Sequence, residues 1–312
     1  MNDYLQNSTL RTLLKTLNIP VPVPPILKRN LQPFSNDELK AKKIAVAGIE
    51  TAFLHTLQKE FHAKSDNATI YDERIDGLVV SCIGMQTIED LEDLYTTVKN
   101  TVSKINANGR VVLISRTDET TALSAAVQKS IDGFTRALSK EIGGKSGITV
   151  NQLKITNTNV MPVETANAAF FFLSDKSSFI TGQVVELGNS FSTPFSSPEK
   201  LLKDKIAIVT GGARGIGASA ARVLHREGAK VILVDVPSAK EDADKLALEI
   251  NADVILEDIT DPKATALIQQ YVINKYKGLD ILVNNAGITR DKTIAKMSID
   301  QWRSVLNVNL KA

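Results

Sequence analysis

Apolar residues along the chain follow two alternating patterns. Short runs rich in Val, Ile and Leu, typical of strands buried on both faces, occur at residues 43–48, 76–84, 109–115 and 148–155, and again at 205–212, 230–236, 253–260 and 279–287. Between them lie longer segments in which apolar residues recur three or four positions apart, as on one face of a helix. This alternation predicts α/β structure, with parallel sheets covered by helices on both faces.

One of the helical segments is SAAVQKSIDGFTRALSKEIG, residues 124–143. Its apolar face is formed by Val127, Ile131, Phe134, Leu138 and Ile142. Ser124 and Gln128 stand four positions apart on the first turns of this helix. Two polar groups at that spacing could carry chemistry or could mark a place where chemistry has been lost.

The strand pattern contains an internal repeat. KKIAVAG from residue 42 matches DKIAIVTG from residue 204, and DGLVVSCIG from residue 76 matches DILVNNAG from residue 280. The two matched segments lie much closer together in the first copy than in the second. The stretch missing from the first copy is the one that carries the second and third strands of the second copy.

Composition changes this picture little. The chain of 312 residues has a formal net charge of +2, 43% hydrophobic and 23% charged residues, which is typical of globular proteins and does not call for nucleic acid as a partner. Cys82 is the single cysteine, so an intrachain disulfide and a multi-cysteine metal site are excluded and a cytoplasmic location is expected. We read no export signal at the N-terminus, no membrane span and no metal site.

TGGARGIG, residues 210–217, directly follows an apolar strand and opens a helix. Glycines at 211, 215 and 217 allow a tight turn, a close approach to a pyrophosphate and an open helix N-terminus. Asp235 ends the next strand, 18 residues past Gly217, near the position expected for a ribose-binding acid. The segment therefore predicts a dinucleotide site.

Asp235 also bears on which dinucleotide binds. Its carboxylate can accept hydrogen bonds from the ribose hydroxyls of NAD(H), but it would repel the 2'-phosphate of NADP(H). NAD(H) is therefore favoured, and NADP(H) is the alternative, because Arg214 could accommodate that phosphate.

TGGARGIG, Asp258 in EDIT, NNAG at 284–287 and NVNL at 307–310 together resemble the short-chain dehydrogenase/reductase family, and most of all the long, two-domain 3-oxoacyl-[acyl-carrier-protein] reductases. The resemblance implies two Rossmann-like, doubly wound parallel-sheet domains. The expected organisation is an N-terminal helix and Pro-rich arm at 1–40, a degenerate, flavodoxin-like domain without a cofactor motif at 41–195, and a truncated NAD-binding reductase domain at 200–312.

The resemblance also implies roles for particular residues. The pyrophosphate would be lined by Gly211, Arg214, Gly215, Ile216 and Gly217. Asp235 would hold the adenosine ribose, and the adenine would be flanked by Asp258 and Ile259. The far ribose would be supported by Asn285, Ala286 and Gly287, and Asn309 would belong to the proton relay.

The family's serine, tyrosine and lysine, the last two four residues apart, find no counterpart in the second copy, and we expect them beyond Ala312. In the first copy, aligning Gly133 and Phe134 with the family's GF places Ser124 and Gln128 at the tyrosine and lysine positions, and Arg116 at the serine. The first copy therefore lacks the family's three catalytic residue types at these positions, and we expect it to be structural and to supply a partner surface.

The complete protein is therefore expected to reduce a 3-oxoacyl thioester, on acyl-carrier protein or coenzyme A, to the 3-hydroxyacyl form, as in fatty acid biosynthesis. A homo-oligomer is expected, and residues 1–312 alone are expected to be inactive. Two alternatives stay open: a 3-hydroxyacyl-CoA dehydrogenase or another short-chain alcohol dehydrogenase, and a catalytically silent nucleotide-binding or scaffold protein.

Overall fold

The computed structural model describes residues 12, 16–17, 25–28, 30, 32, 34–35, 37–48, 51–61, 73–117, 120–156, 162–188 and 200–312. The predicted N-terminal helix lies almost wholly outside these residues. The chain divides into two compact units, the first comprising Met1–Gln32 and Asn36–Ser196 and the second Ser197–Ala312 with Pro33–Ser35. Each unit is an α/β structure with a parallel sheet, which confirms the predicted fold class.

The first unit is built on five parallel strands that lie in the sheet in the order of the chain. They are β1 (Ile44–Gly48), β2 (Ile75–Ser81), β3 (Ile105–Arg116), β4 (Thr149–Ile155) and β5 (Val184–Leu187). Four helices connect them: α2 (Thr51–Phe61), α3 (Ile88–Thr101), α4 (Ala122–Ser146) and α5 (Pro162–Leu173). The segment predicted as a helix at 124–143 is therefore helical throughout, as part of α4.

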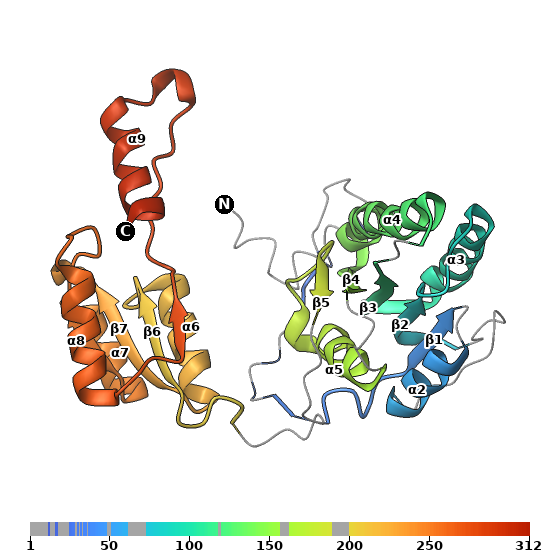
Figure 1. Cartoon of the computed structure of the whole chain (residues 1–312), viewed down its shortest axis with the longest axis horizontal. Coiled ribbons are helices and arrows are strands. Elements are labelled where there is room, and N and C mark those ends of the chain that lie inside the picture. Colours follow the sequence, from blue (N-terminus) through green and yellow to red (C-terminus); the bar gives the residue numbers. More distant parts are fainter. Residues whose placement is uncertain are drawn as a thin grey trace. The chain divides into compact units, whose positions relative to one another are not determined.

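Helices cover both faces of this sheet (Figure 1). Leu94 of α3 and Ile131 of α4 are buried in one core cluster, and Leu57 of α2 and Phe172 of α5 in the other. The strands supply apolar side chains to both clusters, which explains their continuous Val and Ile runs.

The connections of the first sheet have an unusual consequence. α2 leads from β1 to β2 and α3 from β2 to β3, so both step one strand in the same direction, yet they cover opposite faces. Two such crossovers have opposite hands, although parallel crossovers are right-handed in about 98% of cases. One of the two therefore departs from the rule.

The second unit has four parallel strands in the order β8-β7-β6-β9. They are β6 (Ile206–Thr210), β7 (Lys230–Asp235), β8 (Asp253–Leu256) and β9 (Ile281–Val283). The helices are α6 (Gly215–Arg226), α7 (Lys240–Ile250), α8 (Ala264–Tyr276) and α9 (Ile299–Leu306). α6 and α7 pack on one face of the sheet and α8 on the other.

The two sheets show which strands the first unit lacks. By the sequence repeat, β1 corresponds to β6 and β2 to β9. Asp76 in β2 accepts a hydrogen bond from a backbone N–H at the start of β1, and Asp280, just before β9, accepts one from a backbone N–H at the start of β6. β6 has β9 on one side and β7 and β8 on the other, whereas among the described residues β1 pairs with β2 alone. In the described part of the first unit, no strand stands where β7 and β8 stand in the second.

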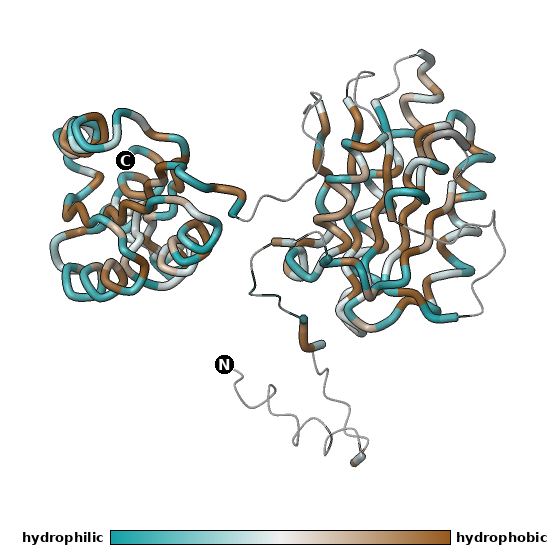
Figure 2. The backbone as a smooth tube through the Cα atoms, turned by 90° about the horizontal axis from the view of Figure 1, so that it is seen from below, coloured by the Kyte–Doolittle hydropathy of each residue, from teal (hydrophilic) through white to brown (hydrophobic). Residues whose placement is uncertain are grey.

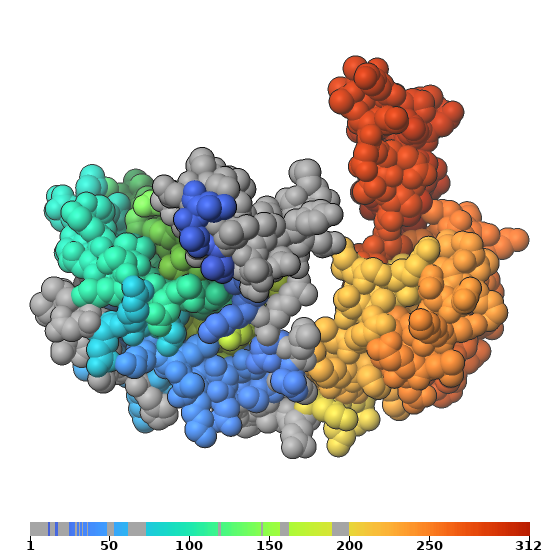
Figure 3. Space-filling view, turned by 180° about the vertical axis from the view of Figure 1, so that it is seen from behind, coloured from blue at the N-terminus to red at the C-terminus, as the bar shows by residue number. Residues whose placement is uncertain are grey.

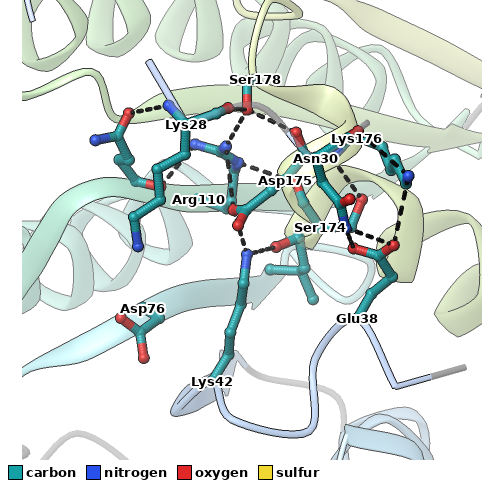
Figure 4. Close-up of polar contacts among 12 residues, drawn as sticks. Lys28, Asn30, Glu38, Lys42, Asp76, Arg110, Ser174, Asp175, Lys176 and Ser178 are labelled. Atoms are coloured by element: carbon teal, nitrogen blue, oxygen red, sulfur yellow. Dashed lines mark hydrogen bonds and ion pairs between the residues drawn. The ribbon is translucent and has the colours of Figure 1, made fainter. Parts of the chain in front are cut away.

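A polar cluster fixes the described part of the Pro-rich arm to the first unit (Figure 4). At its centre the fully buried Arg110 of β3 donates to the carbonyl oxygen of Ser174 at 3.2 Å and to Ser178 Oγ at 2.9 Å. Ser178 Oγ in turn contacts the carbonyl oxygen of Lys28 in the arm. A single buried guanidinium therefore holds together β3, the segment after α5, and the arm.

Ion pairs surround Arg110 in the same cluster. Asp175 lies 3.7 Å from its guanidinium and 2.7 Å from Lys42 Nζ, and Lys176 pairs with Glu38 at 3.7 Å. Burial lowers the pKa of Arg110, and the charge of Asp175 works against that shift. The buried cation thus keeps an anionic partner.

Hydrophobic character follows the strands of both units, and hydrophilic segments lie towards the outside (Figure 2). None of the helices in the described part of the chain has the length and apolar character that a bilayer crossing requires. In the second unit, the segment that carries α9 stands out from the rest of the unit (Figure 3).

Candidate functional site

The turn between β6 and α6 adopts backbone conformations that only glycine takes up readily. Gly211 has φ of +61° and Gly215 has φ of +56°, both in the left-handed region. Arg214 is the N-cap of α6, and its side chain makes no capping hydrogen bond. The first N–H groups of α6 are therefore free of a side-chain cap, as an anion site requires.

Glycine is also required where the turn packs against its neighbours. A Cβ on Gly217 would lie 2.1 Å from the carbonyl oxygen of Gly211 and 2.6 Å from Asn285 Nδ2. A Cβ on Gly215, by contrast, would meet nothing within 4 Å. Gly217 thus lets the helix approach the turn, and Gly215 faces open space in which a pyrophosphate would fit.

The NNAG segment after β9 is tied to the same turn. Asn285 Nδ2 donates to the carbonyl oxygens of Thr210 and Gly211, each at 3.0 Å. Thr210 Oγ1 accepts from the backbone N–H groups of Asn285 and Ala286, each at 3.1 Å. Thr210 was not singled out in the sequence, although a hydroxyl at the end of a strand next to the glycine turn is the signal that points to it.

Asn309 lies in a π-helical turn, Asn307–Lys311, that continues α9. Its side chain accepts from the N–H of Ile288 at 2.9 Å and donates to the carbonyl oxygen of Ile288 at 3.1 Å. A Cβ on Gly287 would lie 3.5 Å from Asn309 Oδ1. Asn309 thus fixes the loop that follows NNAG, and π-helical turns are frequent at functional sites.

Asp235 ends β7 beside the glycine turn. Its Oδ2 accepts from the N–H of Ala213 at 3.0 Å, and its Oδ1 accepts from the N–H of Val236 at 2.9 Å. The carboxylate is therefore held in place by two backbone groups and keeps further lone pairs for a ligand hydroxyl.

Asp258 and Ile259 follow β8 at the same edge of the sheet. The carboxylate of Asp258 accepts from the hydroxyl and the backbone N–H of Thr260, at 2.7 and 2.9 Å, and these bonds lower the pKa of Asp258. Ile259 is partly buried and borders an apolar groove of about 480 Å³ that also reaches Thr210 and Asn284.

The predicted cofactor residues lie at or just after the carboxyl ends of β6, β7, β8 and β9, whereas Asn309, predicted for the proton relay, follows α9. Strand order reverses between β6 and β9, and open α/β sheets bind ligands at such a reversal. Ile216 differs from the rest because its side chain is 82% exposed on the first turn of α6. The geometry fits a dinucleotide at this edge.

The corresponding positions of the first unit are occupied by structural contacts. Gln128 is 2% exposed; its Nε2 donates to the carbonyl oxygens of Cys82 and Met85 at 2.8 and 2.7 Å, and its Oε1 accepts from the N–H of Arg116 at 3.1 Å. Ser124 forms a capping box with Thr121 at the start of α4. These side chains stabilise loops and a helix end and leave no exposed acid–base pair.

Two further features of the first unit agree with this. A Cβ on Gly48, at the end of β1, would lie 2.2 Å from the carbonyl oxygen of Ser81, so the strand ends are in close contact there. Cys82 is buried, and burial raises the pKa of its thiol to about 12. Among the described residues there is also no cluster of His, Cys, Asp and Glu that could hold a metal ion.

The spacing of a tyrosine and a lysine four residues apart does occur in the second unit, on α8, as Tyr271 and Lys275. Both contact Asp253, at 2.8 and 2.7 Å, and Tyr276 does so at 2.7 Å. Asp253 begins β8, at the opposite edge from Asp235, which ends β7. Asp253 thus holds both side chains of this pair at the edge of the sheet opposite Asp235.

The second unit is similar in sequence to proteins of a known family. The sequence model of the short chain dehydrogenase family matches residues 205–312. A 3-oxoacyl-[acyl-carrier-protein] reductase from Thermotoga maritima is 38% identical over 115 residues, which are 35% of this chain and 46% of the relative.

Two further relatives match the same share of the chain. An acetoacetyl-CoA reductase from Acinetobacter is 42% identical over 116 residues, 35% of this chain and 46% of the relative. A 3-alpha-(or 20-beta)-hydroxysteroid dehydrogenase from Mycobacterium bovis is 38% identical over 106 residues, 34% of this chain and 41% of the relative. The chain spans less than half the length of these relatives.

Proposed function

We propose that the protein is an oxidoreductase that uses NAD(H) to reduce a 3-oxoacyl thioester to the 3-hydroxyacyl form, because residues 205–312 match the sequence model of the short chain dehydrogenase family. The observation that carries the proposal is the turn after β6, where Gly211 and Gly215 have positive φ and Gly217 has no room for a Cβ. A turn of this kind allows α6 to pack closely and leaves its backbone open to the approach of a phosphate group.

The residues of the chain divide the work of binding. The turn and the open N-terminus of α6 take the pyrophosphate, and Asp235 accepts hydrogen bonds from the adenosine ribose. Asp258 and Ile259 border the adenine, while the segment from Asn285 to Gly287 supports the far ribose. Bound NADH supplies the hydride for the reduction.

Asn309 belongs to the proton relay in this proposal. Because its side chain holds the loop at Ile288, the π-helical turn and the loop after β9 keep one fixed geometry. The serine, tyrosine and lysine of the family do not occur at matching positions of the second unit, and the tyrosine and lysine on α8 lie at the other edge of the sheet.

The substrate class comes from the relatives. One acts on a 3-oxoacyl-[acyl-carrier-protein] and another on acetoacetyl-CoA by their names, so a 3-oxoacyl thioester on either carrier is the proposed substrate. The single cysteine favours the cytoplasm as the place of this reaction.

Assembly into a homo-oligomer is part of the proposal, with the first unit as a partner surface. The outward face of α4 carries Ala126, Gly133 and Gly144, and a Cβ at either glycine would meet nothing within 4 Å. A Gly133→Trp substitution should reduce the molar mass measured by light scattering, whereas an unchanged mass would count against α4 as the interface.

The test of function is a pair of titrations of the whole protein with NADH and NADPH, followed by nicotinamide absorbance after addition of acetoacetyl-CoA. Tighter binding of NADH, lost in Asp235→Ala but kept in the control Glu249→Ala, supports the assignment. Failure of both nucleotides to bind overturns it. Binding of NADH without oxidation by any 3-oxoacyl thioester would replace the reductase by the catalytically silent alternative.

A further inference from the structure

Arg214, the residue that could accept the extra phosphate of NADP(H), is already engaged. Its Nε lies 3.4 Å from Asp242 Oδ2, on the first turn of α7. We infer that Asp242 is a positioning residue that holds Arg214 against α7 and thereby sets the preference for NAD(H) over NADP(H). This inference rests on the proposed function, because it concerns the same nucleotide site.

The three charged side chains lie around one corner of the site. Asp235 accepts from the N–H of Ala213, and Arg214 is the next residue, so the arginine starts beside the carboxylate that would hold the ribose. An arginine free to turn towards a 2'-phosphate could bind it with two parallel hydrogen bonds. Asp242 instead holds the Arg214 side chain in a contact of 3.4 Å with α7, for which a 2'-phosphate would have to compete.

Lys240, on the same turn of α7 as Asp242, is engaged in a similar way. Lys240 Nζ lies 2.6 Å from Asp244 Oδ2, one helical turn further along α7. Both cations near the start of α7 are therefore paired with acids of that helix. A 2'-phosphate arriving here would have to compete with a carboxylate for either cation.

The size of the effect follows from exposure. The side chain of Arg214 is 70% exposed and that of Asp242 is 49% exposed, so the pair is solvated and weak. Exposed ion pairs shift an equilibrium by a factor of about two to five. We therefore expect Asp242 to adjust the preference between the nucleotides, with Asp235 as the larger contribution.

A matched pair of residues supplies the control. Arg222 on α6 and Glu249 on α7 form another exposed arginine–carboxylate ion pair, with two hydrogen bonds of 2.7 Å, further from the glycine turn. Glu249 lies seven positions beyond Asp242 on α7. Glu249→Gln removes one charge and one ion pair, as Asp242→Asn does, but leaves Arg214 in place.

The experiment measures dissociation constants for NADH and NADPH by nicotinamide fluorescence with the whole protein and four variants. These variants are Asp242→Asn, Glu249→Gln, Arg214→Ala and the double variant Arg214→Ala/Asp242→Asn. Asp242→Asn should bind NADPH about two- to fivefold more tightly and NADH as before. Glu249→Gln should change neither constant, and the gain should vanish in the double variant relative to Arg214→Ala.

Two results overturn the inference alone. The first is that the protein binds NADH but Asp242→Asn leaves the dissociation constant for NADPH unchanged. The other is an equal gain when Arg214 is absent, which would make Asp242 a general repulsive charge and not a positioning residue. If the unmodified protein binds neither nucleotide, the proposed function fails, and the inference fails with it.

Discussion

Gly217→Ala is the sharpest test of the nucleotide turn. The new methyl group would lie 2.1 Å from the carbonyl oxygen of Gly211 and 2.6 Å from Asn285 Nδ2, and neither is the end of a long flexible side chain. Relief requires α6 to move off the turn or the Asn285 amide to give up its bonds to Thr210 and Gly211. Overpacking of this kind costs about 1 to 3 kcal/mol.

That cost can be followed in two measurements. For a domain of this size the Tm of the second unit should fall by about 5 to 15 °C. Loss of the Asn285 contacts should also weaken NADH binding by on the order of five- to tenfold. Calorimetry of unfolding and fluorescence titration measure the two effects on the same preparation.

Substitutions at two other glycines distinguish the effect of close packing from that of backbone strain. Gly278→Ala adds a methyl group that meets nothing within 4 Å, and its φ is not positive, so neither the Tm nor the affinity should change. Gly215→Ala also meets nothing but has φ of +56°, so it should cost about 1 to 2 kcal/mol of stability through backbone strain and place a methyl group in the proposed pyrophosphate space. A Gly217→Ala protein with unchanged Tm and unchanged NADH affinity would refute the close-packing argument.

Three further predictions concern groups outside the turn. Arg110→Met removes the cation that joins β3 to the arm, so urea unfolding should show about 3 kcal/mol less stability in the first unit, and a loss below 0.5 kcal/mol would refute the clamp. Gln128→Leu deprives the Met85 carbonyl oxygen and the Arg116 N–H of the amide, whereas the Cys82 carbonyl oxygen still accepts from the N–H of Met85; the change should cost about 1 to 3 kcal/mol in the same assay, and an unchanged midpoint would show that water replaces the amide. Burial raises the pKa of Asp253, but hydrogen bonds from Lys275 and the two tyrosines outweigh burial and hold the pKa below its ordinary value. The stability that these bonds contribute is present above about pH 4 and is lost as the pH falls further. Acid unfolding of the second unit should therefore depend less on pH below about pH 4 in Asp253→Asn, and equal slopes would contradict this reasoning.

The fold class could be predicted because strand and helix patterns are local. The Val and Ile runs of β6 and β7 are buried on both faces, as parallel strands require, and the helical pattern of residues 124–143 lies within α4. The missing strands could also be predicted, because a repeat of unequal length shows directly which stretch is absent. The hand of the crossovers in the first sheet could not, since it depends on which face each helix covers.

In the site, the glycine spacing could be predicted because φ and close packing constrain residue type at the position itself. Gly211, Gly215 and Gly217 each have a backbone or packing reason that no other residue satisfies as well. Their use in binding, and the roles of Asp235 and Asn309, stay predictions until a nucleotide is titrated. The contact of Asp242 with Arg214 carries no such local signature.

The sequence by itself determined the two parallel α/β units, the repeat and the glycine turn, because each is a pattern within a short stretch of chain. Only the tertiary structure decided what the polar side chains do. In the structure Gln128 donates to the carbonyl oxygens of Cys82 and Met85, more than 40 positions away in the sequence. Tyr271 and Lys275 contact Asp253, at the edge of the sheet opposite the glycine turn. Spacing along a helix fixes which residues share a face, but the partner of that face is set by the packing of segments distant in the sequence.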